Sequence, residues 1–586
     1  MKKVISVFMT IIIGFIFLPV FIAFADDNEI TLDEYSEQLG ELSEKYGISS
    51  IGGINSSTNL GEISLNRIMV KTSDNLPLEE DCGAVAKIEG YDGNHIMQYS
   101  SESATNEAYE YYSSLANVEF VEFDFVFSIP ETELEPDVEY IEYDYSKEYL
   151  SWGSYTTKVN EAISYAEYLG EDAPEIVVAV IDTGIDAEHS FFQNRVIDSR
   201  YDKVNNDENP DDDNGHGTHV AGIIIDNTAP NVKVSAYKTI EKNGFGYYLN
   251  TCVAIRKAVE DGADVINMSL AWEQTQEIYN AFEYSIDYAT DFGVSVVVCA
   301  ANFFNDASLY CPASNNDAIT VAATTTNNIP WHDSNYGECV DVAAPGHEIL
   351  STTLGNYFIE DSGTSMATPF VSAAAAFLKT LDPNFAPEII KSIIKESVFV
   401  PENWNADYGT GILDFSEIVD KCISAQPKIV LNVNNDAVIY SDNTDAVFHY
   451  TTTGTKPYVG QADIYKDPID ISGANSIIAI SCEPGKFPSV AAELKINWTE
   501  KITLRYKGTK YLELPPNKSI TFCYSNNPDI VTVDNKSGML YGVSVGNAKV
   551  YVYLETGQRI ICDVTVKYES WQWFIIYFFF GFLWYI

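Results

Sequence analysis

Basic residues are scarce in this sequence. Its 586 residues include 34 Lys and Arg against 85 Asp and Glu, which gives a formal net charge of −51 at pH 7. Nucleic-acid binding needs a basic surface that contacts phosphates, so this class of function is excluded. The acidity is typical of a solvated, aggregation-resistant surface on an exported protein. The alternative is an electrostatic field that attracts basic peptides or cations.

Cysteine is sparse as well. The nine cysteines are odd in number, and none follows the C-x-x-C spacing that is typical of a metal site. Cys523 and Cys562 fall in one strand-rich region, where they could bridge two strands or remain free buried thiols. The pattern leaves both alternatives open.

Two uncharged apolar runs lie at the ends of the chain. Lys2 and Lys3 precede a run that ends at Ala23-Phe24-Ala25, the small-x-small pattern that signal peptidase reads. Residues 1–25 therefore predict a bacterial signal peptide and a secreted chain. Residues 571–586 (WQWFIIYFFFGFLWYI) would reach about 24 Å as a helix, short of the ~30 Å hydrocarbon core. We expect them to associate with the membrane and to hold the protein at the cell envelope, because such a tail would aggregate in water.

Between these ends the sequence pattern changes several times. Residues 31–48 place apolar side chains at helical spacing, which is typical of an amphipathic helix. Over residues 66–128, strand-like segments surround a helical one (SATNEAYEYYSSL) and predict a compact α+β unit. Residues 130–149 are acidic and contain proline, as expected of an exposed linker.

Residues 150–425 alternate between apolar strands and helices. Segments such as EIVVAVID, VKVSAYK and VSVVVCAAN are near-continuous Val, Ile and Ala runs, as expected for strands buried on both faces of a parallel sheet. Helical segments such as SMATPFVSAAAAFLKTL separate them, so we predict an α/β doubly wound parallel sheet. Beyond Pro427 the helical patterns end. Strand-like segments with turn residues continue to residue 567 and predict two β-sandwich modules, 427–497 and 498–567.

The α/β region carries the chemistry. Peptide hydrolysis by a serine enzyme needs a nucleophile, a base, a group that orients the base and donors for the oxyanion. Asp182 closes the strand EIVVAVID at the carboxyl edge of the sheet, where the sites of open α/β folds collect. His216 begins an apolar helix, whereas His219 lies within it and is interpreted as structural. Ser365 precedes an Ala-rich helix, whose first N–H groups favour a forming anion. Asn302 follows the run VSVVVCAA and could donate its amide at the same edge.

Each of these residues alone has an ordinary explanation, such as a turn aspartate or an N-cap serine. Together, the order Asp, His, Ser is that of subtilisin. The segments VAVIDTGID, DNGHGTHVAGI, VINMSL, VDVAAPG and GTSMATPFVSAAAA make residues 150–425 resemble the catalytic domain of subtilases, the peptidase S8 family. The resemblance implies a serine endopeptidase with Asp182 as orienting acid, His216 as general base, Ser365 as nucleophile and Asn302 as oxyanion donor. The alternatives are an inactive surface-binding protein on this scaffold and, as a subtype, a processing protease with one native substrate.

The resemblance also implies a substrate-binding surface, formed by Ser269, Leu270, Ala271, Ala301 and Leu309. Subtilases commonly carry Gly-Gly after VINMSL and Gly before the oxyanion Asn, whereas this sequence has Ala271-Trp272 and Ala301. The extra methyl groups predict a narrow primary specificity pocket, with Leu309 near its floor, that accepts small or medium apolar side chains. The acidic surface favours the alternative, selection of Arg or Lys.

A metal site is not expected. Many subtilases insert a calcium-binding loop after GTHVAG, but here only IIIDNTAPN separates this motif from the next strand. The resemblance implies an enzyme that requires no cofactor. Calcium could still bind elsewhere in the protein, but not at the usual loop of the family. The acidic run Asp211-Asp212-Asp213 could bind a cation weakly or form a solvated loop.

The flanking regions carry further resemblances. Residues 66–128 resemble the ferredoxin-like, inhibitor I9-like propeptide of subtilases. Residues 427–497 resemble a chitobiase C-terminal-type sandwich, and residues 498–567 resemble a bacterial Ig-like group 2 domain. These resemblances imply that residues 26–149 form a propeptide and linker that inhibits its own protease until it is cleaved within about residues 120–150. They also imply cell-wall contact through the C-terminal modules.

Overall fold

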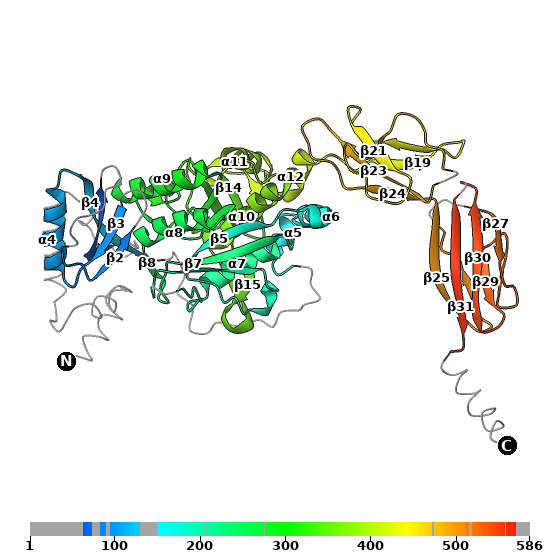
Figure 1. Ribbon diagram of the computed structural model, residues 1–586, viewed down its shortest axis with the longest axis horizontal. Coiled ribbons are helices and arrows are strands. Elements are labelled where there is room, and N and C mark those ends of the chain that lie inside the picture. Colours follow the sequence, from blue (N-terminus) through cyan, green and yellow to red (C-terminus); the bar gives the residue numbers. More distant parts are fainter. Residues whose placement is uncertain are drawn as a thin grey trace, which may run out of the picture. The chain divides into compact units, whose positions relative to one another are not determined.

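The computed structural model describes most of the chain between residues 62 and 569: 62–72, 82–89, 94–128, 149–205, 208–274, 276–471, 474–514, 519–556 and 558–569. The predicted signal peptide, the predicted helix 31–48, nearly all of the linker and the apolar segment 571–586 lie outside these residues. Within them, no helix is both long and apolar enough to cross a membrane. The chain divides into two compact units, one up to Ile418 and one from Val419, which are described separately (Figure 1).

The first unit is built on a nine-stranded sheet. Only its edge strand β17 runs antiparallel to its neighbour, so the predicted parallel sheet is confirmed. The strands are buried Val, Ile and Ala runs because both faces of the sheet are covered. In spatial order they are β17 (Val398–Phe399), β18 (Ile412–Leu413), β14 (Val342–Pro345), β13 (Ile319–Thr324), β11 (Ser295–Cys299), β9 (Val265–Met268), β5 (Ile176–Asp182), β7 (Val232–Lys238) and β6 (Val196–Asp202).

The strand order reverses beside β5. The chain adds β7 on one side of β5, crosses to β9 on the other side, and then continues outward through β11, β13 and β14. Ligands of open α/β sheets bind outside the carboxyl ends of the strands at such a switch point. The residue that ends β5 at this edge is Asp182.

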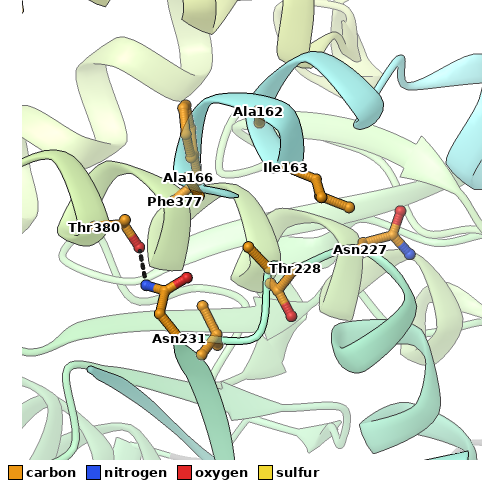
Figure 2. A pocket seen from close by; sticks show the side chains of 10 residues that line it. Ala162, Ile163, Ala166, Asn227, Thr228, Asn231, Phe377 and Thr380 are labelled. Carbon is orange, nitrogen blue, oxygen red and sulfur yellow. Dashed lines mark hydrogen bonds between the residues drawn. The ribbon is translucent and has the colours of Figure 1, made fainter. Parts of the chain in front are cut away.

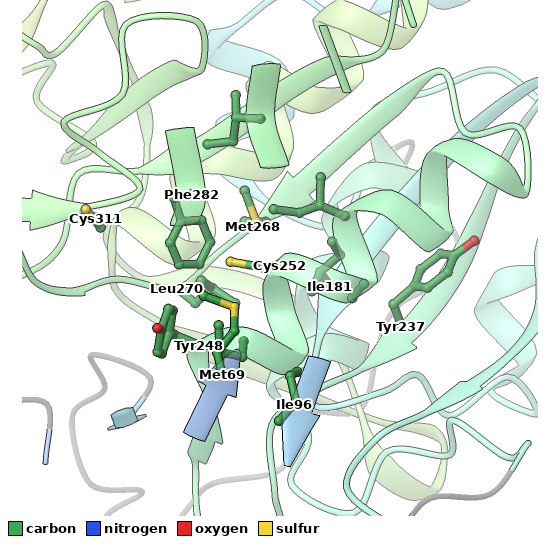
Figure 3. Packing of buried hydrophobic residues seen from close by; sticks show 14 of the residues in the cluster. Met69, Ile96, Ile181, Tyr237, Tyr248, Cys252, Met268, Leu270, Phe282 and Cys311 are labelled. Carbon is green, nitrogen blue, oxygen red and sulfur yellow. The ribbon is translucent and has the colours of Figure 1, made fainter. Parts of the chain in front are cut away.

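Helices cover both faces of this sheet. On one face α8 (Tyr248–Glu260) and α9 (Gln276–Asp291) pack on side chains such as Ile181 and Met268, which Figure 3 shows with Cys252 and Phe282. Neighbouring strand residues point to the opposite face. There α7 (His216–Asp226) and α10 (Thr364–Leu381) pack against each other. The shorter helices described between residues 149 and 422 are α5 (Trp152–Thr156), α6 (Asn160–Leu169), α11 (Pro387–Glu396) and α12 (Phe415–Cys422).

The predicted α+β unit is present. Its strands are β1 (Glu62–Thr72), β2 (Ala86–Glu89), β3 (Asn94–Gln98) and β4 (Val118–Ser128), with α4 (Glu102–Ser113) packed on β1 and β4. The sequence interpretation missed β3, a short segment (NHIMQ) with little apolar alternation. The sheet continues into the α/β region, because β4 pairs antiparallel with β8 (Phe245–Tyr247).

This unit shares its hydrophobic core with α8 and α9. Met69 and Ile96 join the same buried cluster as Tyr248 and Phe282 (Figure 3). Arg67 of β1 pairs with Asp124 of β4 at 3.2 Å, within the α+β unit, and reaches across to α8, where it donates to Asn250 Oδ1 at 2.9 Å. The α+β unit therefore packs as a body against the α/β domain.

The second unit is β-rich, and none of its described residues beyond Cys422 is helical. One core holds the sheets β19 (Lys428–Leu431)–β20 (Ala437–Tyr440) and β22 (Asp463–Ile464)–β21 (Val447–Thr451)–β23 (Ser476–Cys482)–β24 (Ala492–Lys495). A separate core holds β25 (Asn497–Arg505)–β31 (Arg559–Lys567)–β30 (Gly546–Leu554)–β27 (Ile520–Ser525) and β26 (Thr509–Tyr511)–β29 (Met539–Gly542)–β28 (Val531–Val533). Cys523 and Cys562 share this second core as free thiols, so the bridge that the sequence left open is not formed.

Candidate active site

Asp182 and His216 form a buried hydrogen-bonded pair. Nδ1 of His216, the first residue of α7, lies 2.7 Å from Oδ1 of Asp182, and the Thr183 N–H donates to the same oxygen at 2.7 Å. A carboxylate that accepts from Nδ1 fixes the tautomer in which Nε2 carries the lone pair. The arrangement can therefore take a proton at Nε2.

Asp212 holds the start of α7 in place. Its carboxylate accepts from the backbone N–H of Gly215 (2.9 Å) and Thr218 (3.0 Å), from the hydroxyl of Thr218 (2.6 Å) and from the hydroxyl of Thr183 (2.8 Å). Burial raises the pKa of Asp212, and the hydrogen bonds from Thr218 and Gly215 oppose that rise. Because Thr183 follows Asp182 directly, Asp212 ties the end of β5 to the first turn of α7. The sequence interpretation missed this role, although an acidic side chain just before an apolar helix is a capping signal.

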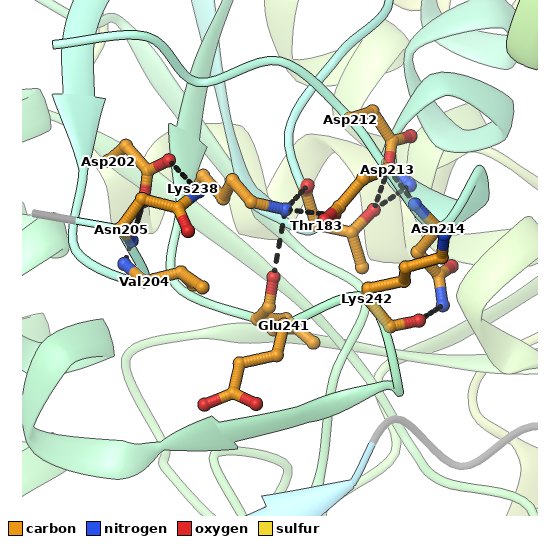
Figure 4. Close-up of polar contacts among 12 residues, drawn as sticks. Thr183, Asp202, Val204, Asn205, Asp212, Asp213, Asn214, Lys238, Glu241 and Lys242 are labelled. Atoms are coloured by element: carbon orange, nitrogen blue, oxygen red, sulfur yellow. Dashed lines mark hydrogen bonds and ion pairs between the residues drawn. The ribbon is translucent and has the colours of Figure 1, made fainter. Parts of the chain in front are cut away.

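The neighbouring Asp213 is paired with a cation of the protein itself. The buried ammonium of Lys238 lies 2.6 Å from Asp213 Oδ1 and also donates to the carbonyl oxygens of Thr183 (2.6 Å) and Ile240 (3.2 Å), as Figure 4 shows. Across the part of the chain that the structure describes, no group of three His, Cys, Asp or Glu side chains is arranged to hold a metal ion. The ammonium of Lys238 therefore neutralises the charge of Asp213 within the acidic run 211–213.

Ser365 lies in the first turn of α10, where two hydrogen bonds join it to Ser269, the residue after β9. Its hydroxyl donates to the carbonyl oxygen of Ser269 at 3.2 Å, and the Ser269 hydroxyl donates to the carbonyl oxygen of Ser365 at 2.8 Å. The second bond depends on Pro369, four residues on, because proline has no N–H to offer the Ser365 carbonyl within the helix. Local sequence thus fixes the serine against the end of β9.

The amide of Asn302 faces the same turn. Its Oδ1 accepts from the N–H (2.9 Å) and the hydroxyl (2.7 Å) of Thr364, which assigns the other amide atom as the Nδ2 donor. A Cβ placed on Gly363 would lie 3.1 Å from that Nδ2, so only glycine leaves it this room. Burial raises the pKa of the nearby Cys299 thiol to about 12, which keeps this thiol protonated and poorly nucleophilic.

The residues predicted to bind substrate separate into two groups. Ala271 and Ala301 belong to one buried cluster at the ends of β9 and β11, and Ser269 bonds to Ser365 directly. The side chain of Leu270 instead joins the core against α8 and α9, so only its backbone faces this edge. Leu309, predicted near a pocket floor, is 52 % exposed and lies outside this cluster, whereas its neighbour Tyr310 is buried within it.

His219, interpreted as structural, is buried within α7, and its Nε2 lies 3.2 Å from the Ile359 carbonyl oxygen. A small hollow lies far from the site, near the C-terminal end of α10 (Figure 2). It is lined by alanines and other uncharged side chains, and Asn231 donates to Thr380 at 3.0 Å across it. Thr380 follows Ser365 by 15 positions, roughly 22 Å along a helix. The hollow offers no acid or base for catalysis.

Asp226, at the opposite end of α7 from His216, fixes the start of the α/β domain. Its carboxylate accepts from the Leu150 N–H (3.0 and 3.1 Å) and the Ser154 hydroxyl (2.7 Å), and burial raises its pKa from 3.8 to about 6. Between pH 3.8 and about 6, Asp226 is therefore protonated in the folded state but ionised in the unfolded state. Folding stability contributed by this group falls by about 3 kcal/mol as pH rises from about 4 to 6.

We expect Asp226→Asn to remove this pH dependence. The melting temperature of the variant, relative to that of the wild type, should increase as pH rises from 4 to 6.5, because the amide stays neutral throughout. Thermal melts across this range measure it. The matched control is Asp172→Asn, which replaces an exposed carboxylate and should melt in parallel with the wild type. Parallel melting curves for Asp226→Asn would contradict the assignment.

The sheet edge, the Asp182–His216 pair and a serine at a helix N-terminus define an α/β serine hydrolase site. Residues 173–411 match the sequence model of the subtilase family, peptidase S8. The chain is 41 % identical over 217 residues to a thermophilic serine proteinase of Bacillus sp. strain AK1, covering 35 % of this chain and 53 % of that protein. It is 37 % identical over 210 residues to thermitase of Thermoactinomyces vulgaris, covering 34 % of this chain and 74 % of thermitase. The chain therefore belongs to the subtilase family of serine endopeptidases.

The match spans only part of other relatives, including 61 % of subtilisin-like protease 1 of Pseudogymnoascus destructans, at 37 % identity over 41 % of this chain. Among solved structures, a cold adapted subtilisin-like serine proteinase aligns at 32 % identity, with 41 % of this chain and 89 % of that chain covered and a TM-score of 0.38. The flanking α+β unit and the β-rich unit lie outside the family match.

Proposed function

We propose that this chain is a secreted serine endopeptidase, made as an autoprocessed proenzyme, in which Ser365, His216 and Asp182 form the catalytic triad. The observation that carries the proposal is the 2.7 Å contact between Asp182 and His216 at the start of α7, the helix against which α10 packs with Ser365 in its first turn. The direct test is hydrolysis of an unfolded protein by the purified full chain, with the Ser365→Ala chain as the matched control.

The reaction follows from the roles of these groups. The Ser365 hydroxyl attacks the carbonyl carbon of the scissile peptide bond, and its proton passes to Nε2 of His216. The C–N bond then breaks, the leaving amine takes that proton, and an acyl-enzyme remains on Ser365. Water repeats the two steps and releases the acid. Asp182 stabilises the transient imidazolium, and none of these steps requires a metal ion or a cofactor.

Asn302 stabilises the oxyanion in this mechanism, because its Oδ1 is bound by Thr364 and its Nδ2 remains the donor. We expect Asn302→Ala to lower kcat about 10²- to 10³-fold, the loss that removing one such donor causes in subtilisin. Asn302→Asp keeps the acceptor for Thr364 but lacks the donor, so it should lose at least as much. Single-turnover kinetics measure both. Near wild-type kcat in Asn302→Asp would show that the amide serves only to hold Thr364.

The proenzyme proposal rests on the packing of the α+β unit. Strand β4 adds to β8, Arg67 reaches Asn250, and the linker follows β4 directly. We propose that residues 26–149 inhibit the protease and are removed by Ser365 itself within about residues 120–150. N-terminal sequencing of the matured chain locates the bond.

Localisation is proposed from the sequence. The signal-peptide pattern supports secretion, and one relative, 28 % identical over 52 % of this chain, is the minor extracellular protease Epr of Bacillus subtilis. Residues 571–586 would retain the chain at the cell envelope, and the β-rich modules would contact the cell wall. Membrane flotation of the full chain and of a chain that lacks 571–586 tests the retention: equal flotation of both contradicts it.

A further inference from the structure

The ends of β9 and β11 border the nucleophile. These two strands are parallel neighbours, with Met268 opposite Val298. The segment after β9 contacts Ser365 through Ser269, and the segment after β11 contacts the same helical turn through Asn302. A carbonyl attacked by Ser365 with its oxygen toward Asn302 must therefore place the side chain of its own residue between these two segments. Ala271 and Ala301 are the small side chains that bound this space.

Tyr310 lies on a third element, β12, next to the space between the segments that follow β9 and β11. The two-residue strand β12 (Tyr310–Cys311) pairs with β10 (Trp272–Glu273), which directly follows Ala271. This pairing places the Tyr310 ring in the same buried cluster as Ala271 and Ala301. Tyr310 is only 2 % exposed, Ala271 3 % and Ala301 0 %. All three side chains are thus buried in one cluster, with almost no surface open to water.

The ring of Tyr310 is held at both its face and its tip. It stacks on Phe303, the residue after Asn302, with ring centroids 5.1 Å apart and planes 12° from parallel. Its hydroxyl accepts a hydrogen bond from Asn305 Nδ2 at 3.3 Å. A substrate side chain would have to break the stacking, the hydrogen bond and the burial together to displace the ring. The ring therefore acts as a fixed wall.

The wall on the β11 side is fixed as well. Ala301 has a positive φ of 76°, a conformation that favours glycine, yet it carries a buried methyl group. That methyl removes further room next to Asn302. Leu309, half exposed, contributes no wall.

We propose that Tyr310 closes the pocket for the residue before the scissile bond, so that this enzyme cleaves after glycine and alanine and excludes larger side chains. This inference rests on the proposed function, because it assigns the substrate class of the same Ser365 site. It narrows the sequence-based expectation of small or medium side chains, and it excludes selection of Arg or Lys by the acidic surface.

The test compares peptides that differ only in the residue before the scissile bond: Gly, Ala, Leu, Phe or Arg. The full chain is expressed and matured as wild type, Tyr310→Gly and Tyr310→Phe, and active sites are counted by titration with a sulfonyl fluoride. We expect wild-type kcat/KM for Ala to exceed that for Phe by about 100-fold or more, since the pocket has no room for the ring. Tyr310→Gly should reduce this ratio at least 10-fold by gaining activity on Phe. Tyr310→Phe keeps the ring and loses only the contact with Asn305, so it should keep the ratio.

The wild-type ratio decides the proposal even where Tyr310→Gly fails to fold. Cleavage after Phe, Leu or Arg as fast as after Ala by the wild type overturns the proposal while leaving the peptidase function intact. An unchanged Ala-to-Phe ratio in a titratable Tyr310→Gly enzyme overturns it as well. A wild type that neither cleaves any peptide nor reacts with the sulfonyl fluoride refutes the peptidase function itself.

Discussion

Ser365→Ala is expected to lower kcat for peptide hydrolysis on the order of 10⁶-fold, the loss that removal of the nucleophile causes in subtilisin. The substitution removes only the hydroxyl that donates to Ser269 at 3.2 Å, a bond with a net value of about 1 kcal/mol. The fold should therefore persist, and the reciprocal bond from the Ser269 hydroxyl to the residue-365 carbonyl should remain. Steady-state hydrolysis and a thermal melt of the same preparation measure the two effects.

The same variant tests maturation. Without Ser365 the chain should keep residues 26–149 attached, whereas the wild type should lose them, and N-terminal sequencing distinguishes the two. Ser308→Ala is a matched control: this exposed serine lies in the same unit, and its loss should change neither activity nor processing. Processing of purified Ser365→Ala at the wild-type bond, with no other protease present, would refute autocatalysis.

Asp182→Asn is expected to lower kcat about 10⁴-fold with little change in melting temperature. The amide matches the carboxylate in size and keeps an oxygen for the Thr183 N–H, so the end of β5 stays in place. It carries no negative charge, however, and cannot stabilise the imidazolium of His216 during the reaction. The measurement is kcat at saturating peptide, together with a thermal melt.

Asp186→Asn is the matched control for this prediction. Asp186 follows Asp182 by four residues, and its carboxylate accepts from the Gly355 N–H at 2.9 Å. Its substitution should leave kcat within a few-fold of the wild type. Equal losses in the two variants would mean that the loop after β5, and not the charge of Asp182, determines activity.

The sequence places each predicted site residue at one end of an apolar run. Asp182 ends the buried strand β5, His216 begins α7, and Ser365 is the second residue of α10, so apolar periodicity was sufficient to locate the ends of these elements. The parallel sheet followed from the same runs. The order of these residues along the chain then indicated the type of enzyme, because Asp, His and Ser occur in the order found in subtilisin.

The missed features depend on contacts between residues distant in sequence. The Tyr310 ring reaches the pocket because β12 pairs with β10, and no local pattern distinguishes it from Leu309, the adjacent residue. The partner of Asp213 is Lys238, 25 positions away, so the acidic run resembled a solvated or cation-binding loop. Asp226 likewise binds Leu150 across 76 positions. Strand pairing and helix packing create these contacts. Which distant residues meet depends on the register of that pairing, and the local sequence pattern around each residue does not reveal it.

Covalent labelling tests whether Ser365 is the nucleophile. The full wild-type chain is treated with a fluorophosphonate, digested, and mapped by peptide mass spectrometry, with loss of hydrolysis followed in parallel. We expect one adduct, on Ser365, that forms in step with the loss of activity and is absent from Ser365→Ala. Inactivation with the adduct on another residue, or full hydrolysis by a chain whose Ser365 is completely labelled, would contradict it.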